Sequence, residues 1–117
     1  MSPGPDAGRA RGPRDDGTFA LSIIERDGYV FVAARGDVDV ESVTAFNEGL
    51  REAVTRTAED VRVDLAGVTF LGSEGIRTLV LLHDDAAAQG TRVTVTDASP
   101  IVRRVLALTE SDWLLGG

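Results

Sequence analysis

The sequence predicts a small α/β sandwich. Its mixed, mostly parallel sheet has about four strands, beginning with an antiparallel hairpin, and it carries three or more helices. After two β-rich runs, segments of helical periodicity alternate with further β-rich runs. An Asp-Gly pair, typical of a tight hairpin turn, separates the first two runs. The later strand–helix–strand units require crossover connections, which make neighbouring strands parallel. With 117 residues, the chain fits one domain with one core.

β-branched and aromatic residues predict four strands, at 19–25, 29–34, 61–65 and 92–96. The second run, YVFVAA, is almost continuously apolar, which predicts burial on both faces of the sheet. Gly36 is expected to end that strand. An Ala-Gly pair is expected to end the third strand, after which the chain extends toward a serine-containing turn.

Apolar residues at helical spacing predict three helices. The first runs from about 40 to 57, and the second follows Ser73 and ends before Gly90, a glycine suited to a C-cap. Ser99 and Pro100 open the third as N-cap and first helical residue. Residues 113–115 are expected to fold back onto the core. The residues expected on the inner faces are Val43, Phe46, Leu50 and Val54, then Ile76, Leu79, Val80, His83 and Ala87, then Ile101, Val105 and Leu108.

Composition indicates a folded domain over 18–117 preceded by a disordered tail over 1–17, which is rich in Gly, Pro and charge. No apolar run is long enough to span a membrane and no signal peptide is visible, so we expect a cytoplasmic protein with no membrane partner. The chain has no cysteine and one histidine, so we expect no disulfide, metal site or cofactor.

The formal net charge is −7, and all of it lies after the tail, which holds three Arg and three Asp. This argues against a nucleic-acid partner, because phosphate binding needs a basic face. It mildly favours a partner with a basic surface, although solubility alone is a simpler explanation of the charge.

Ser73 stands where an apolar run stops and a helical pattern begins. A serine before a helix caps an orphan amide, and Glu74 beside it meets the positive helix end. These roles leave Gly72 and Gly75 unexplained. Glycine within the first turn costs roughly 1 kcal/mol relative to alanine, so we expect a close approach to the backbone at Gly75.

Two chemistries can be compared for this serine. A nucleophile would need a base, but His83 is about ten residues along the same helix, or about 15 Å away, so serine hydrolysis is not expected. A phosphoacceptor fits better, because free amides and the helix dipole tolerate a phosphate. The added charge would transform the local surface without breaking the fold. Two glycines beside the serine also leave room for a kinase.

The segments VRVDLAGVTFLGSEGIRTLVLL and QGTRVTVTDASPIVRRVLALTESD, with GDVDVESVTAF upstream, resemble the STAS domains of bacterial anti-sigma factor antagonists (anti-anti-sigma factors). The resemblance covers about 19–115. It implies a STAS-like sandwich and partner switching in transcription regulation: the antagonist binds an anti-sigma factor that is itself a serine kinase, phosphorylation ends the binding, and a phosphatase resets the switch.

By position, the resemblance makes Ser73 the phosphorylation site. It also implies partner-binding residues, which are Asp37, Asp39, Gly72, Glu74 and Gly75, with Gly36 opening the acidic loop. The common family pattern has Asp before the serine, where this chain has Gly72. Glu74 also departs from the pattern and adds a charge beside the acceptor, which is expected to slow phosphorylation or to select a particular kinase.

An alternative within the same family is a STAS scaffold or accessory subunit of a stress-sensing assembly or a lipid-transport ABC complex. An enzyme is not expected, because the sequence offers no well-placed base, no metal cluster and no phosphate loop.

Overall fold

The computed structural model describes residues 19–57 and 59–116, so the predicted tail over 1–17 lies outside the described residues. Four strands form one sheet in the order β1-β2-β3-β4. Only β1 and β2 pair antiparallel, and the other two pairs are parallel, which confirms the predicted fold class. The strands are β1 (Phe19–Arg26), β2 (Tyr29–Val38), β3 (Asp60–Leu71) and β4 (Arg92–Ala98).

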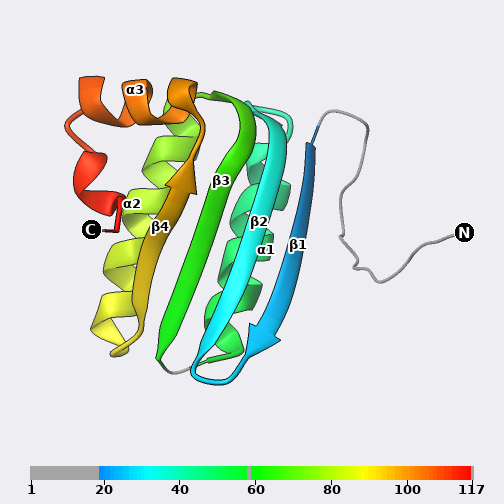
Figure 1. Cartoon of the computed structure of the whole chain (residues 1–117), viewed down its shortest axis with the longest axis vertical. Helices are drawn as coiled ribbons and strands as arrows, with labels where there is room; N and C mark the ends of the chain where they lie inside the picture. Colours follow the sequence, from blue (N-terminus) through cyan, green and yellow to red (C-terminus); the bar gives the residue numbers. More distant parts are fainter. Residues whose placement is uncertain (1–18, 58, 117) are drawn as a thin grey trace, which may run out of the picture.

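The helices form a single layer. Figure 1 shows α1 and α2 side by side against one face of the sheet, while α3 lies across the end of β3 and β4. The other face of the sheet carries no helix among the described residues. The helical elements are α1 (Val43–Thr55), α2 (Ser73–Ala88), α3 (Pro100–Leu108) and the short 3₁₀ helix η1 (Asp112–Leu114).

The core lies between the sheet and the layer of α1 and α2. Phe46 and Leu50 of α1, with Leu79 of α2, are fully buried against alternate strand residues such as Val32 and Val63. Burying one such side chain contributes about 1.5–3 kcal/mol, so this interface supplies most of the fold's driving force. The ring of Phe46 also meets that of Phe19 edge-on at 6.1 Å, which ties α1 to β1.

The expectation that β2 is buried on both faces is wrong. Val30, Val32 and Ala34 are buried under the helices, but Tyr29 and Phe31 on the opposite face are only half-buried. The physical reason is the single helix layer, which leaves that face of the sheet without a cover.

Two predicted strand ends are also wrong. β2 continues past Gly36, which adopts a left-handed φ of 94° at a shift in the register with β3. β3 continues through Ala66 and Gly67 opposite a second register shift. Bulges of this kind absorb an irregular residue without ending a strand. As a result, both strands extend to the turn that carries Ser73.

Local cap signals are confirmed, whereas some helix faces are not. The Ser99 hydroxyl accepts from the Val102 amide, and Gly90 adopts φ of 87° after α2. On α3, however, Val102 and Leu106 are buried, not the expected Ile101 and Leu108. Two further expected inner-face residues lie elsewhere, since Ala87 is exposed and Val80 is half-buried on α2, where Leu82 and Ala86 are buried instead.

The C-terminal segment only partly folds back. Leu114 is buried, but Trp113 is 50% exposed and meets the ring of His83 edge-on at 4.8 Å. The amide of Gly116 donates to the carbonyl of Val95, which attaches the end of the described chain to β4.

Candidate functional site

Ser73 is the first helical residue of α2, and its side chain is exposed. The expectation that Ser73 caps the helix is therefore wrong. The N-cap is Gly72, in an extended conformation, and no side chain caps α2. Because the Ser73 hydroxyl makes no hydrogen bond to the described residues, it is available to an outside molecule.

The turn before α2 leaves two backbone donors at the same place. The amides of Gly75 and Ile76 donate to the carbonyl of Gly72 at 3.0 and 3.1 Å. The amides of Ser73 and Glu74 have no acceptor among the described residues, as expected for the first turn of a helix. These donors and the helix dipole favour an anion at the position of the Ser73 hydroxyl.

Gly75 is explained by packing. It is buried, and a Cβ built there would lie 2.6 Å from Cδ1 of Leu71 and 2.8 Å from Cγ1 of Val38. The close approach expected at this glycine therefore comes from the ends of β2 and β3. Gly75 lets the first turn of α2 settle on these strands, which fixes the position of Ser73. The turn is also anchored by the Gly72 amide, which donates to the carbonyl of Val38.

Asp39 organises the loop between β2 and α1. Its Oδ1 accepts from the amides of Glu41 and Ser42 and from the Ser42 hydroxyl, at 3.0 to 3.1 Å. The backbone hydrogen bond from Ser42 is the main reason why the pKa of Asp39 is lowered. This closed turn also explains why α1 begins at Val43 and not at about Val40 as predicted.

Asp37 lies at the end of β2, just before this loop. The hydroxyl of Thr69 on β3 donates to Asp37 Oδ1 at 2.6 Å, across the strand pair. The buried hydroxyl of Ser42 donates to the Asp37 carbonyl at 2.7 Å. Both acids predicted for partner binding therefore also hold the loop in shape. With Glu74, they place negative charge around the position of Ser73.

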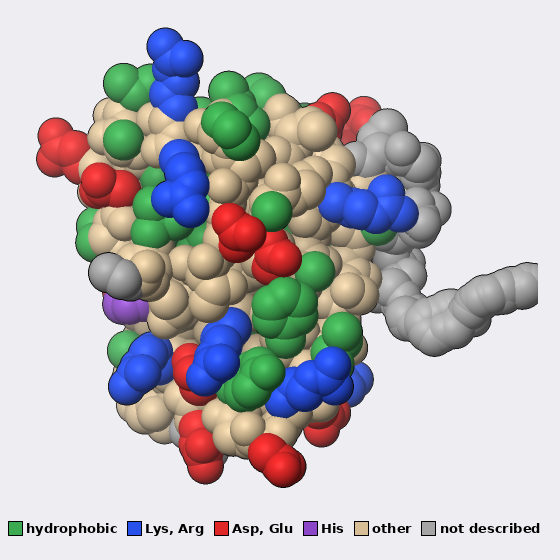
Figure 2. Space-filling view, viewed as in Figure 1, with side chains coloured by type: hydrophobic (Ala, Val, Ile, Leu, Met, Phe, Trp, Pro, Cys, Tyr) green, Lys and Arg blue, Asp and Glu red, His purple; other side chains and the backbone are tan. Residues whose placement is uncertain are grey.

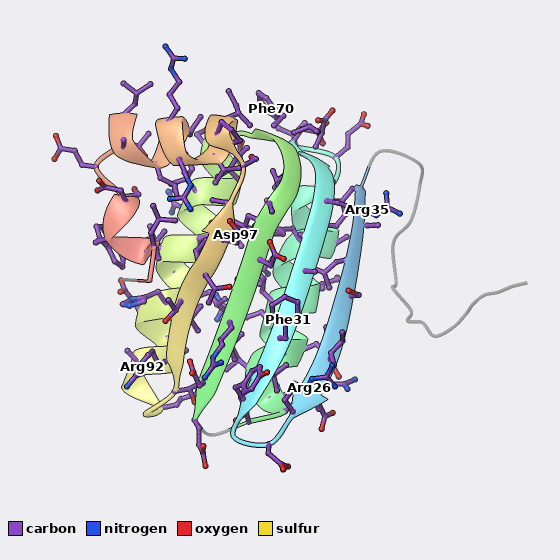
Figure 3. The ribbon with its side chains drawn as sticks, viewed as in Figure 1. Arg26, Phe31, Arg35, Phe70, Arg92 and Asp97 are labelled. Carbon is purple, nitrogen blue, oxygen red and sulfur yellow. The ribbon has the colours of Figure 1, made fainter. Side chains whose placement is uncertain are left out.

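The sequence did not identify the apolar part of this surface. Phe70, at the end of β3, is 49% exposed, and its ring edge lies close enough to Gly72 that a Cβ there would be 3.3 Å from it. Val40, next to Asp39, is 70% exposed. Figure 3 shows Phe70 at the upper end of the sheet, near the start of α3. We call the surface formed by Asp39, Val40, Phe70, Gly72, Ser73 and Glu74 the Ser73 surface.

No catalytic arrangement accompanies Ser73 in the described part of the chain. The single histidine, His83, lies against Trp113 and is 3.3 Å from the carboxylate of Asp84. Residues 19–57 and 59–116 contain no group of three or more metal-ligating side chains, and none of their helices is long and apolar enough to cross a membrane.

The fold and site define a two-layer α/β domain with an exposed helix-start serine beside acidic and apolar groups. A family model described as "Mlab, STAS domain" matches residues 24–116, so the chain belongs to the STAS domain family. This confirms the resemblance found in the sequence. A STAS-domain containing protein of Pseudomonas aeruginosa is 32% identical over 71 residues, which cover 58% of this chain and 70% of that protein.

Other relatives are named as antagonists. The anti-sigma-F factor antagonist RsfB of Mycobacterium tuberculosis is 23% identical over 95 residues, covering 81% of this chain and 77% of that protein. A crystal structure of an anti-sigma factor antagonist from Mycobacterium paratuberculosis superposes with a TM-score of 0.74 at 22% identity, covering 86% of each chain. Unphosphorylated SpoIIAA gives a TM-score of 0.68 at 18% identity, covering 85% of this chain and 86% of that one.

Proposed function

We propose that this protein is an anti-sigma factor antagonist that binds an anti-sigma factor serine kinase and is released when that kinase phosphorylates Ser73. The observation that carries the proposal is the exposed Ser73 hydroxyl at the start of α2, beside two unpaired amides. The relatives named as anti-sigma factor antagonists support the same class of partner. SpoIIAA is known in a phosphorylated form, which supports a switch by phosphorylation.

The Ser73 surface suits a protein partner because it combines apolar and acidic groups. Phe70 and Val40 offer exposed apolar area, which docks well into a pocket. Asp39 precedes Val40 in the sequence, and Glu74 follows Phe70 across the turn before α2. A partner with basic residues around an apolar pocket would complement both the acids and the apolar side chains. The proposed partner surface is therefore an apolar pocket with a basic rim.

Phosphorylation is a transfer between the kinase's ATP and Ser73. A bond forms between Ser73 Oγ and the γ-phosphorus while the bond from that phosphorus to the β–γ bridging oxygen breaks. ADP leaves, and the hydroxyl proton passes to a base supplied by the kinase. A phosphatase reverses the state by using water to release inorganic phosphate.

The kinase is released because phosphorylation puts charge on Ser73, at the edge of the proposed apolar contact. The phosphate adds about −1.5 to −2 charges at neutral pH, stabilised in the free protein by the helix dipole and the amides of Ser73 and Glu74. In the complex, the same group would have to lose its water beside the ring of Phe70, where the partner offers an apolar pocket. Binding is therefore weakened while the fold is kept.

The test is the intact mass after incubation with ATP and candidate anti-sigma serine kinases. We expect a gain of one phosphate in the natural protein and in Ser22→Ala, which removes another exposed serine on β1, but no gain in Ser73→Ala. Binding to the kinase is expected to weaken at least about ten-fold after phosphorylation. Equal phosphorylation of Ser73→Ala would contradict the assignment of the site.

A second candidate is a STAS scaffold or accessory subunit of a transport or stress-sensing assembly. The observation that favours it is the matching family model, which is described by the name Mlab. Copurification from the host with a membrane ATPase, and not with a serine kinase, would support this candidate.

A further inference from the structure

The face of the sheet opposite α1 and α2 has no cover among the described residues (Figure 1). We call it the open sheet face. Phe31 lies at its centre and pairs with Ile24 of β1 on one side and Arg62 of β3 on the other. Ile24 is 38% exposed and Phe31 is half-buried, so this face presents apolar area to its surroundings. An uncovered apolar strip of this kind favours association.

Charges on the open sheet face are arranged in rows across the strands. One row contains Asp64 paired with Asp97, which places two acids side by side. On the other side of the Phe31 row, two residues before Thr94 of that row, Arg92 lies on β4 next to Asp60 of β3. Figure 2 shows acidic groups in the middle of this face, basic groups with some acidic ones among them below, and a further basic group above. Figure 3 places Asp97 and Arg92 at the two levels.

Arg62 belongs to the central row but points toward the basic one. Its guanidinium carbon lies 3.9 Å from the centre of the Tyr29 ring, and its Nε donates to Asp60 Oδ2 at 3.0 Å. Tyr29 lies two residues before Phe31 on β2, and Asp60 lies two residues before Arg62 on β3, so both are on the side of the Phe31 row where Arg92 lies. The positive charge is thus held on the side away from Asp64, which strengthens the separation of acidic and basic rows.

We infer that two copies of this protein associate through their open sheet faces as a symmetric dimer. A two-fold axis perpendicular to the strands, passing through the Phe31 row, brings the acidic row of each copy opposite the basic row of the other. Phe31 then meets Phe31 of the second copy, and Asp97 faces Arg92. Asp64 faces the ion pair of Arg62 and Asp60, whose guanidinium lies between the central and the basic rows. A single face that carries both halves of its own complement fits a second copy better than a partner of one charge.

The competing contacts of Asp97, Asp64 and Arg92 are weak. Asp97 Oδ1 accepts from the adjacent Ala98 amide at 2.9 Å and is 3.8 Å from Arg103 Nη2, with both side chains more than half exposed. Asp64 accepts only from the amide of Ala66 among the described residues. No side-chain hydrogen bond is formed by Arg92 within the described part of the chain. Exposed pairs of this type contribute little, so a second copy can displace them.

The expected contact area of the dimer is small. Four strands of about eight residues cover roughly 19 by 26 Å, or about 500 Å² on each copy. The total of about 1,000 Å² is at the lower end of specific interfaces, so the dimer should form reversibly with concentration. The Ser73 surface lies at the end of the strands, so the axis places the two Ser73 surfaces at opposite ends of the dimer. Each remains open to its own kinase.

Sedimentation equilibrium of the full chain, from low micromolar to millimolar concentration, tests this inference. We expect the average mass to rise from 12.4 kDa toward twice that value. Asp97→Arg alone and Arg92→Asp alone should each need at least about ten-fold higher concentration to dimerise. An equimolar mixture of the two variants should recover dimerisation, because each copy then supplies the charge that the other lacks. Circular dichroism should show that both variants remain folded.

The matched control is Glu48→Arg, which makes the same charge change on α1, on the side of the sheet away from the open sheet face. It should dimerise like the natural protein. A natural protein that stays at 12.4 kDa at millimolar concentration would overturn the inference. Variants that dimerise as well as the natural protein, or a mixture that recovers nothing, would overturn it too. None of these results affects the phosphorylation assay, so the dimer and the proposed function fail separately.

Discussion

Replacing Gly75 with alanine distinguishes local helix propensity from tertiary packing, because the two predict opposite changes in the free energy of unfolding. Gly75 is in the first turn of α2, where alanine should stabilise a helix by about 1 kcal/mol. The added Cβ, however, would lie 2.6 Å from Leu71 Cδ1 and 2.8 Å from Val38 Cγ1. Both neighbours are almost completely buried, and Val38 is stiff about χ1, so neither can move aside easily.

Overpacking a well-filled site of this kind costs about 1–3 kcal/mol, so after the helix-propensity gain of about 1 kcal/mol the free energy of unfolding should fall by up to about 2 kcal/mol. Urea denaturation measures this directly, and the melting temperature should fall by about 4–8 °C for each kcal/mol. Adding Leu71→Val, which removes the clashing methyl group, should recover part of the loss. Phosphorylation of Ser73 should also slow if the turn is displaced.

Gly72→Ala is the matched control, three residues earlier. Its Cβ would meet the exposed ring of Phe70 at 3.3 Å, and this ring can shift into solvent. The packing penalty is therefore absent, and the free energy of unfolding should fall by no more than about 1 kcal/mol, the cost of alanine as a poorer N-cap. If Gly75→Ala is more stable than the natural protein, as helix propensity alone predicts, the reasoning from packing is refuted.

Three further predictions concern the Ser73 surface and its loop. Phe70→Ala should weaken kinase binding by about 2 kcal/mol in a titration while Leu108→Ala, another exposed apolar truncation, leaves binding unchanged. Ser42→Ala should lower the free energy of unfolding in urea by about 1–3 kcal/mol, because the buried hydroxyl bonds both the Asp37 carbonyl and the Asp39 amide. The pKa of Asp39 is lower in the folded protein than in the unfolded chain, so its carboxylate stabilises the fold at pH values above the unfolded pKa, and this stabilisation is lost as the pH falls below about 4. In Asp39→Asn, the free energy of unfolding should therefore depend less on pH in the acid range.

The parts of the fold that were predicted correctly depend on contacts within a few residues. The Asp-Gly hairpin turn needs a left-handed residue, and Gly28 adopts φ of 85° there. Ser99 and Pro100 begin α3 because the serine caps an amide three residues ahead and proline suits the first turn. Crossover chirality then limits how the remaining strands can be arranged.

The wrong predictions concern burial, which depends on the element that packs against a residue. The sequence YVFVAA is equally apolar whether a second helix layer covers Phe31 or not, so its composition could not reveal the open sheet face. On α3, both candidate stripes are apolar, and the helix buries the one containing Val102 and Leu106 because of where its first turn meets β3. Helical periodicity alone does not choose between two apolar stripes.

The candidate site shows the same division. The position of Ser73 at the start of α2 follows from a local change of periodicity, and its exposure agrees with the proposed phosphorylation. The exposed Phe70 was missed, because an aromatic residue near the end of a strand is usually read as core. A possible signal was the adjacent pair Thr69-Phe70, which breaks the alternation of β3, and both side chains are exposed.

The separation of the two surfaces leads to one more prediction, which rests on both proposals. Asp64 of the open sheet face and Leu71 at the end of β3 are seven residues apart on one strand, or roughly 20 Å. This distance exceeds the Debye length of about 8 Å at physiological ionic strength, so a phosphate on Ser73 should be screened from the acidic row. Phosphorylation should therefore abolish kinase binding at one end of the dimer without changing its dissociation constant. Sedimentation of fully phosphorylated protein measures this, and a shift of more than about three-fold would mean that the two surfaces are coupled through the sheet.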